Sequence, residues 1–396
     1  MLNQFDEQID RRNTASTKWD TCEELFYSEE VLPMWIADMD FRNPEPVLEA
    51  MKDVIDQGVL GYSFPCDSLY TAIIEWQKER HALELTKEHI LFSPGVVSSL
   101  GLAVQAFTVK GEAVMIHDPV YPPFAHIVEI NERKLVRSSL LIKDGKYRMD
   151  LVDMEQKFKQ QHIKLFFLCH PHNPGGRVWS REELIELIEL CRQYNVLVIS
   201  DEIHGDLIYP SIEFVSPVSI KKEYRETIVT LTSVTKTFNL AGIKNSMIFV
   251  YDEELKEKLE KAQEKLELCQ INTFGLTGTE AALRYGGPWL QELMAYLTQS
   301  RKMVCDFFDQ NLPNVFYMVP EATYLCWFNV SALGLKDTEL KEYFSDIGKI
   351  GLNDGLPYGS SGAQFMRLNF AAPQSVVQEG LERIKKVFDT AKQTAR

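Results

Sequence analysis

Short apolar runs alternate with amphipathic stretches through the middle of the chain. Between the runs, residues 180–195 give the clearest helical pattern: Ser180 and Glu183 form a capping box, and an apolar stripe follows. Alternation of this kind predicts an α/β fold, with a mostly parallel central sheet covered by helices on both faces. The strand-like runs are residues 90–92, 113–116, 165–169, 196–200, 227–232 and 247–251.

The C-terminal part of the chain follows a different pattern. Residues 252–270 form a charged amphipathic helix pattern, and Pro288 opens a long helical pattern that stops before Pro313. Strand-like runs near 324–330 and 364–370 and a last amphipathic helix predict a smaller α+β domain. We therefore expect three parts: an N-terminal segment that belongs to the small domain (1–45), a large domain (46–286) and the C-terminal small domain (287–396).

Composition narrows the kind of protein. The chain has 396 residues, of which 45% are hydrophobic and 25% charged, as in an ordinary globular protein. A net charge of −15 argues against nucleic acid or an anionic membrane as a main partner. Seven scattered cysteines without a Cys-x-x-Cys pair indicate reduced thiols. With a polar first segment and no apolar run of membrane-spanning length, the expected location is the cytoplasm.

Three polar residues follow strand-like runs and suggest a common chemistry. Lys236 comes after the run 227–232, Asp201 closes the run 196–200, and Asn173 follows the run 165–169. Ligands of a parallel sheet bind at the carboxyl ends of its strands. An amine, a carboxylate and an amide there are the groups that pyridoxal phosphate (PLP) requires. Taken alone, Lys236 would be a solvated loop lysine.

Other chemistries have weaker support. His170 and His172 lie near an acidic cluster, but Pro171 and Pro174 make this segment a turn. No His-Glu-x-x-His or Cys/His spacing is present, so we expect no metal. The sequence also lacks a Gly-x-Gly-x-x-Gly motif after a strand and a Walker A loop, which disfavours a nucleotide site.

An ordered set of motifs then points to a family. The chain resembles the fold-type I PLP enzymes of the class I/II aminotransferase superfamily, and more narrowly their cystathionine β-lyase/C–S lyase (MalY/PatB-type) branch. The resemblance covers nearly the whole chain and implies an aspartate aminotransferase-like fold, in which the large domain binds PLP. Its motifs include Lys18-Trp19-Asp20, the segment 32–41, Gly61-Tyr62-Ser63, the segment 171–179, Asp201-Glu202-Ile203-His204, the segment 235–242 and Arg367-Leu368-Asn369-Phe370.

The resemblance implies a role for each residue around the cofactor ring. Lys236 would hold PLP as a Schiff base and then transfer the substrate proton. Asp201 would pair with the ring nitrogen, Asn173 would donate to the phenolic oxygen, and Tyr121 would stack on the ring. His204 lies three residues after Asp201 and could contact the same oxygen region, although a structural histidine is the alternative.

The resemblance also implies how the phosphate is bound. Backbone N–H groups at Gly95, Val96 and Val97, at a helix N-terminus, would meet it. Ser233 and Thr235 would add hydroxyl donors. Lys244 stands eight residues after Lys236, where the superfamily commonly has an arginine, so its role is open. Tyr62 would reach a phosphate in the neighbouring subunit, which implies a homodimer with shared active sites.

Arg367 is the candidate for binding the substrate carboxylate. Its planar guanidinium can make two hydrogen bonds to a carboxylate, and the run of residues around it is apolar. A structural ion pair is the alternative for this arginine. Trp35, Asp38 and Met39, in the segment 35–39, would cover the pocket near the substrate side chain, although packing between domains would also explain them.

The implied activity is that of a PLP-dependent C–S β-lyase. Its small amino-acid substrate would be L-cystathionine or another cysteine S-conjugate, and the products would be a thiol, pyruvate and ammonia. Two alternatives stay open at this stage: an aminotransferase on the same scaffold, and a PLP-bound regulatory protein with a transcription-factor partner.

Overall fold

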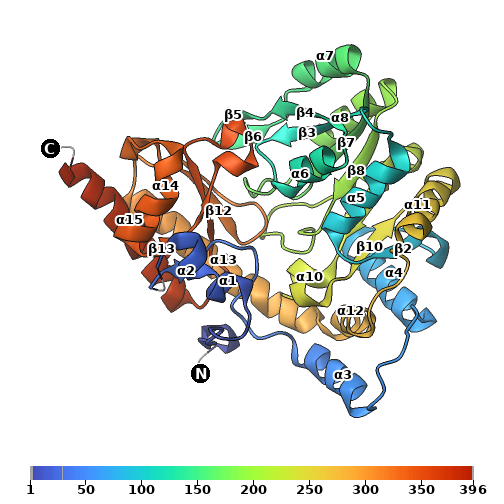
Figure 1. Cartoon of the computed structure of the whole chain (residues 1–396), viewed down its shortest axis with the longest axis horizontal. Coiled ribbons are helices and arrows are strands. Elements are labelled where there is room, and N and C mark those ends of the chain that lie inside the picture. The colour runs from blue at the N-terminus through green and yellow to red at the C-terminus, as the bar shows by residue number, and fades with distance from the viewer. Residues whose placement is uncertain (1–2, 29, 395–396) are drawn as a thin grey trace.

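A twisted sheet forms the centre of the larger lobe (Figure 1). The computed structural model describes residues 3–28 and 30–394. Among the described residues, this sheet has seven strands in the order β2-β10-β9-β8-β7-β3-β4, and of these only β10 runs antiparallel to its neighbours. The mostly parallel sheet is therefore confirmed. The strands are β2 (Ile90–Ser93), β3 (Ala113–Asp118), β4 (Lys134–Ser139), β7 (Ile163–Cys169), β8 (Leu197–Asp201), β9 (Ile228–Thr232) and β10 (Ser246–Phe249).

Helices cover both faces of this sheet, and each strand supplies side chains to both sides in turn. On β3, Val114 and Ile116 pack in a cluster with α5, α6 and α11, whereas Met115 belongs to the core that contains α4, α8 and α12. Alternation of side chains along each strand thus separates the two layers. The bounds are α4 (Asp67–His81), α5 (Val96–Phe107), α6 (Pro123–Ile130), α8 (Arg181–Gln193), α11 (Glu253–Leu266) and α12 (Thr273–Tyr285).

Two helix predictions have different outcomes. The capping box of Ser180 and Glu183 is present and starts α8. The predicted helix over 252–270 is too long, because α11 ends at Leu266. Glu267 there takes a left-handed backbone conformation, and the amide of Leu268 turns back to the carbonyl of Gln263, a common way for a helix to stop. The remaining helices of this lobe are α3 (Glu45–Asp56), α7 (Leu151–Gln161), α9 (Pro217–Ile220) and α10 (Val234–Thr237).

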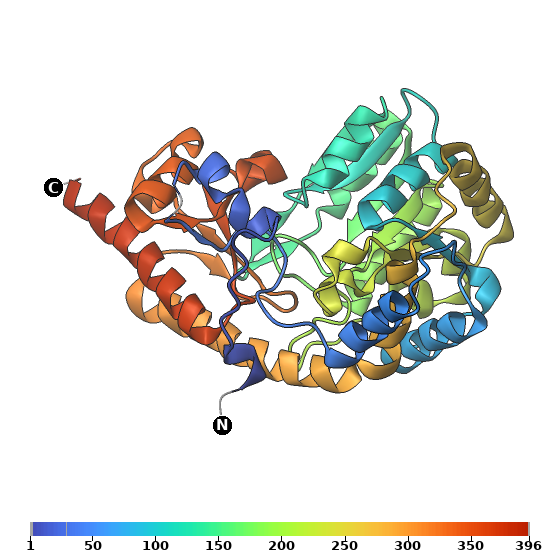
Figure 2. The ribbon, with the colours of Figure 1, turned by 60° about the horizontal axis from the view of Figure 1, so that its bottom comes forward.

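The smaller lobe is an α+β unit, as predicted. Its antiparallel strands lie in the order β11-β12-β15-β14 and pack against long helices. In Figure 2 the orange helix α13 runs along the lower edge of both lobes, and α15 ends at the far side of the small one. The bounds are α13 (Gly287–Asn311), β11 (Tyr317–Met318), β12 (Leu325–Asn329), α14 (Asp337–Tyr343), β14 (Asn353–Asp354), β15 (Phe365–Asn369) and α15 (Gln374–Thr394). Between β4 and α7 in the chain, β5 (Leu141–Lys143) and β6 (Lys146–Arg148) form a separate two-stranded hairpin.

The N-terminal segment lies against the small lobe. Its strand β1 (Leu32–Pro33) pairs in parallel with β13 (Ile350–Gly351), and the blue helices α1 (Thr17–Asp20) and α2 (Cys22–Phe26) lie beside the orange and red elements (Figure 2). This pairing is the one that the predicted grouping of residues 1–45 with the small domain requires. The exact domain boundaries stay a prediction. Among the described residues, no helix combines the length and the apolar character that crossing a bilayer would require.

Candidate active site

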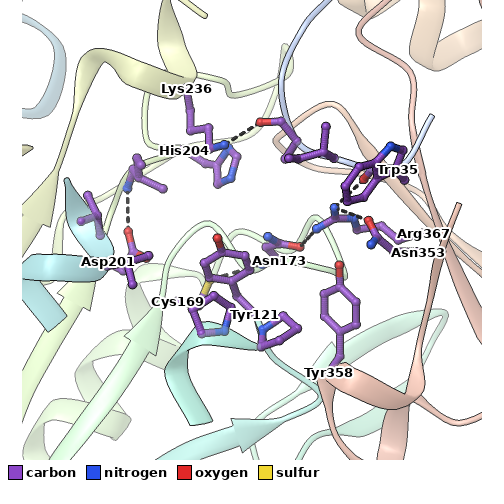
Figure 3. A pocket seen from close by; sticks show the side chains of 17 residues that line it. Trp35, Tyr121, Cys169, Asn173, Asp201, His204, Lys236, Asn353, Tyr358 and Arg367 are labelled. Carbon is purple, nitrogen blue, oxygen red and sulfur yellow. Dashed lines mark hydrogen bonds between the residues drawn. The ribbon is translucent and has the colours of Figure 1, made fainter. Parts of the chain in front are cut away.

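A cavity of about 350 Å³ opens where β7 and β8 end, between the two lobes (Figure 3). The parallel strands deliver Cys169 and Asp201 there side by side, since these two residues are register partners. The cavity thus lies at the edge of the sheet where the sequence placed it. The predicted site residues that line it are Trp35, Val96, Val97, Tyr121, Asn173, Asp201, His204, Lys236 and Arg367.

Lys236 and Asp201 both have shifted acid–base properties. Lys236 lies in the short helix α10, and its Nζ donates to the carbonyl of Ala37 at 2.5 Å. Burial lowers the pKa of Lys236 to about 8 and raises the pKa of Asp201 to about 7. The Asp201 carboxylate accepts a hydrogen bond from the amide of Ile203 at 3.1 Å. A buried carboxyl in this condition suits a cationic partner, such as a protonated ring nitrogen.

His204 and Asn173 present polar atoms in the same cavity. His204 is buried, its Nδ1 has no hydrogen-bond partner, and burial lowers the pKa of its imidazole to about 3, so the ring is neutral. The Oδ1 of Asn173 accepts from Arg367 at 3.0 Å. His204 therefore offers a neutral imidazole to a ligand in this cavity.

Arg367 binds neutral oxygens in this structure. From β15, its guanidinium donates to the carbonyl of Trp35 and to Oδ1 of Asn353, both at 2.7 Å, and it lies 5.4 Å from the centre of the Tyr358 ring. In the part of the chain that the structure describes, none of its hydrogen bonds goes to a carboxylate, and its Nε has no partner. The alternative of a structural ion pair therefore has no support.

The N-terminus of α5 also borders the cavity. Gly95 caps the helix with φ of 101°, and Val96 and Val97 of the first turn line the cavity. Amides of a first turn have no partner within the helix and bind phosphate readily. These residues therefore fit the phosphate of PLP.

The predicted hydroxyl donors lie outside the cavity lining. Ser233 caps α10: its hydroxyl donates to the carbonyl of Asn245 at 2.6 Å and accepts from the amide of Thr235 at 3.1 Å. A phosphate contact from Ser233 would require its donated bond to break. Thr235 and the exposed Lys244 also lie outside the lining, so the predicted contacts of all three stay predictions.

The three predicted residues of the segment 35–39 lie in different surroundings, and their contact with a substrate stays a prediction. Trp35 lines the cavity, whereas Met39 is buried in the main hydrophobic core and Asp38 turns its carboxylate to Arg11 and Lys18. The reason is packing: a long apolar side chain next to the core is buried there, and a carboxylate takes the nearest cations.

Several lining residues were missed by sequence reasoning. Ile203 adjoins His204, and Cys169 is the last residue of the strand-like run before Asn173, so both could have been inferred. Asn353 is the register partner of Arg367, a relation that only the strand pairing reveals. Tyr358 comes from a short turn without any motif. The carbonyl of Ala37 is main chain and leaves no trace in the sequence.

The Tyr62 side chain is 99% exposed and is not part of the cavity lining, so its predicted contact with another subunit stays a prediction. Among the described residues, no group of three or more His, Cys, Asp or Glu side chains is arranged to hold a metal ion.

The fold and the cavity together define an aspartate aminotransferase-like protein of fold type I. The family model "Aminotransferase class I and II" matches residues 29–384, so the chain belongs to that family. It is 43% identical over 381 residues to "Cystathionine beta-lyase PatB" of Bacillus subtilis, covering 96% of this chain and 98% of that protein.

Solved structures agree with the family. Cystalysin from Treponema denticola, whose crystal structure contains a PLP cofactor, superposes with a TM-score of 0.95 at 34% identity, over 98% of this chain and all of that one. The PLP-bound C–S lyase of Staphylococcus hominis gives a TM-score of 0.91 at 31% identity and covers 98% of each chain.

Proposed function

We propose that the protein is a PLP-dependent C–S β-lyase. Its substrate would be L-cystathionine or a related cysteine S-conjugate, cleaved to a thiol, pyruvate and ammonia. The observation that carries the proposal is the convergence of Lys236, Asp201 and Arg367 on one cavity, each from a different element. The name of the relative with 43% identity supports the choice of reaction.

PLP, when bound, would supply an aldehyde for Lys236 and a ring that takes up the electrons released at the substrate Cα. The protein side chains bind the substrate and transfer its proton. Arg367 holds the substrate carboxylate with its fork, and the neutral amine of Lys236 removes the Cα proton. A pKa near 8 leaves part of this amine unprotonated at neutral pH. Asp201 keeps a proton on the ring nitrogen.

The walls of the cavity would complete the site. The first turn of α5, with Gly95, Val96 and Val97, would bind the phosphate, while Tyr121 stacks on the ring. Asn173 and His204 would lie near the phenolic oxygen. The electron pair that the Cα proton leaves behind would form a double bond between Cα and Cβ as the bond from Cβ to sulfur breaks, and the sulfur would leave with its electron pair as a thiolate. Trp35 forms part of the cavity wall.

Product analysis with L-cystathionine tests this function. The purified protein supplied with PLP is incubated with and without a 2-oxo acid, and thiol, pyruvate and new amino acids are measured. A lyase releases thiol and pyruvate without the acceptor. Strict dependence on the acceptor, with formation of a new amino acid, would identify an aminotransferase and contradict the proposal.

A homodimer with shared active sites is the proposed assembly. Between α3 and α4, the segment 59–64 exposes four large apolar side chains: Val59, Leu60, Tyr62 and Phe64 are 65–99% exposed. Such a run of apolar side chains is unfavourable in water and is typical of a protein interface. Two-fold dimers are also the commonest soluble oligomers. We further propose the cytoplasm as the location, which the free cysteines of the chain support.

A further inference from the structure

One short segment contacts both basic side chains that the proposed reaction uses. In the strap, residues Trp35–Ala37, the carbonyl of Trp35 accepts from Arg367 at 2.7 Å. The carbonyl of Ala37 accepts from Lys236 at 2.5 Å and from the Tyr324 hydroxyl at 3.0 Å. Figure 3 shows the bonds from Lys236 and Arg367 to this segment. The position of the strap therefore sets where the amine and the guanidinium lie.

Lys18 supports the strap and is not part of the cavity lining. Its side chain is 1% exposed, and its Nζ donates to the Asp40 carboxylate at 2.7 Å and to the Asp38 carbonyl at 3.2 Å. Its own carbonyl accepts from the indole nitrogen of Trp35 at 3.1 Å. The side chain of Lys18 thus holds the residues that directly follow the strap, while its main-chain carbonyl holds the aromatic side chain that lines the cavity.

Other bonds complete this support. Arg11 pairs with Asp38 at 2.8 Å and with Asp40 at 2.9 Å, and the indole of Trp19 donates to Asp40 at 3.0 Å. On the opposite side, the amide of Asn369 donates to the carbonyls of Ile36 and Asp38, each at 2.7 Å. Burying a charged lysine costs free energy unless the lysine is paired. A lysine that only kept the protein soluble would lie on the surface, so the buried and paired Lys18 indicates another role.

We propose that Lys18 is a positioning residue, which together with Asp40 holds the strap so that its carbonyls orient the Lys236 amine and the Arg367 guanidinium. The proposal rests on the proposed function, since that function makes Lys236 and Arg367 the working groups. Lys18 is not part of the cavity lining and acts through the strap.

The same group of charges acts on Lys236. Asp38 and Asp201 raise the pKa of Lys236, while burial and Arg367 lower it. His204 and Tyr324 also face it, and burial keeps both neutral: the pKa of His204 falls to about 3 and that of Tyr324 rises. Lys18 lies 3.6 Å from the Asp38 carboxylate and offsets its charge. Removing the Lys18 charge should therefore raise the pKa of the Lys236 nitrogen. Removing the Asp38 charge should lower it.

The test compares Lys18→Met and Asp38→Asn in the PLP-loaded protein. The first readout is the pH titration of the cofactor absorbance, which needs no substrate. We expect the pH at the midpoint of this titration to rise in Lys18→Met and to fall in Asp38→Asn. The second readout is KM against kcat: losing one orienting hydrogen bond should raise KM about three- to tenfold in Lys18→Met. The control is Arg42→Met, which removes an exposed ion pair with Glu7 and should change neither.

Shifts in the same direction, or no shift in either variant, would overturn the proposal, because the charges of Lys18 and Asp38 should act on the Lys236 nitrogen with opposite signs. If Lys18→Met does not fold, Arg11→Gln replaces it with the same expected direction, since Arg11 is partly exposed and also pairs with Asp38. Opposite shifts in a protein that releases no pyruvate would support the positioning role and contradict the lyase activity separately.

Discussion

At the scale of single residues, burial controls the charges that the proposed chemistry uses. The Asp201 carboxyl has few polar neighbours, so its pKa rises to about 7, and the same burial lowers the pKa of Lys236 to about 8. In water an aspartate has a pKa of about 4 and a lysine a pKa of about 10, so burial brings both groups closer to neutral pH. The site thus holds an acid and a base close to neutrality, as proton-transfer sites require.

Asp201→Asn should stabilise the protein without cofactor at pH 8. The folded-state pKa of Asp201 lies above its unfolded value, so its contribution to stability falls as pH rises from about 4 to about 7. Asn carries no charge and avoids this loss of stability. The free energy of unfolding of the variant should exceed that of the wild type by on the order of a few kcal/mol at pH 8 and by less at pH 5. Thermal unfolding at both pH values checks this. An apoprotein variant less stable than wild type at pH 8 would mean that the protein itself already compensates the charge.

Arg367→Lys should weaken substrate binding and leave cofactor absorbance unchanged. A lysine offers a point charge and cannot make the paired bonds of the guanidinium, so KM should rise about 10- to 100-fold. The control is Arg383→Lys on α15, where the arginine bonds Glu379 and a carbonyl away from the cavity. Steady-state kinetics measures both variants. An unchanged KM in Arg367→Lys would assign the substrate carboxylate to another residue.

At the scale of elements, the N-terminus of α5 is the most sensitive part of the proposed phosphate site. Gly95 has φ of 101°, which strains any residue with a Cβ, so Gly95→Ala should relax the backbone away from the phosphate. We expect the Kd for PLP to rise at least about fivefold, from a strain of about 1–3 kcal/mol.

A matched control lies in the same helix. Gly101 has ordinary helical geometry, and an added Cβ would make only a normal contact with Ile127. Gly101→Ala should therefore keep the Kd and stabilise the fold slightly. Titration of apoprotein with PLP, followed by absorbance, measures both. Equal affinities of the Gly95 and Gly101 variants for PLP would mean that the N-terminus of α5 does not bind the phosphate.

Elements of the central sheet could be predicted because their signals are local. The apolar runs and the capping box of α8 depend on neighbours in sequence, and the rule that ligands bind at strand ends then brought Asp201 and Asn173 together. The end of α11 could not be predicted in this way, because the helical pattern continues past Leu266 while the backbone turns at Glu267.

At the scale of the whole molecule, the site depends on contacts between distant parts of the chain. Lys18, the strap and Arg367 come from opposite ends of the sequence, and the turn that carries Tyr358 reaches the cavity from the small lobe. No periodicity predicts such contacts, because they follow from how the lobes pack. This is why the family motifs identified Arg367 and missed Asn353 and Tyr358.

Mixing two inactive variants tests the proposed dimer. If Tyr62 acts in the partner's site, a heterodimer of Tyr62→Ala and Lys236→Ala has both lesions in one site and an intact second site. Partial recovery of activity is then expected, up to about half of the wild-type value in each heterodimer. A different affinity tag on each variant allows the heterodimers to be purified and verified. No recovery in verified heterodimers would contradict shared sites.

The central claim is that Lys236 carries the cofactor, and reductive trapping tests it most directly. The protein loaded with PLP is reduced with borohydride and digested, and the peptide that carries the pyridoxyl group is identified by mass spectrometry. We predict the label on Lys236 and on no other lysine, and its loss in Lys236→Ala. A label on Lys244 or any other lysine, or no label on the wild-type protein, would contradict the account.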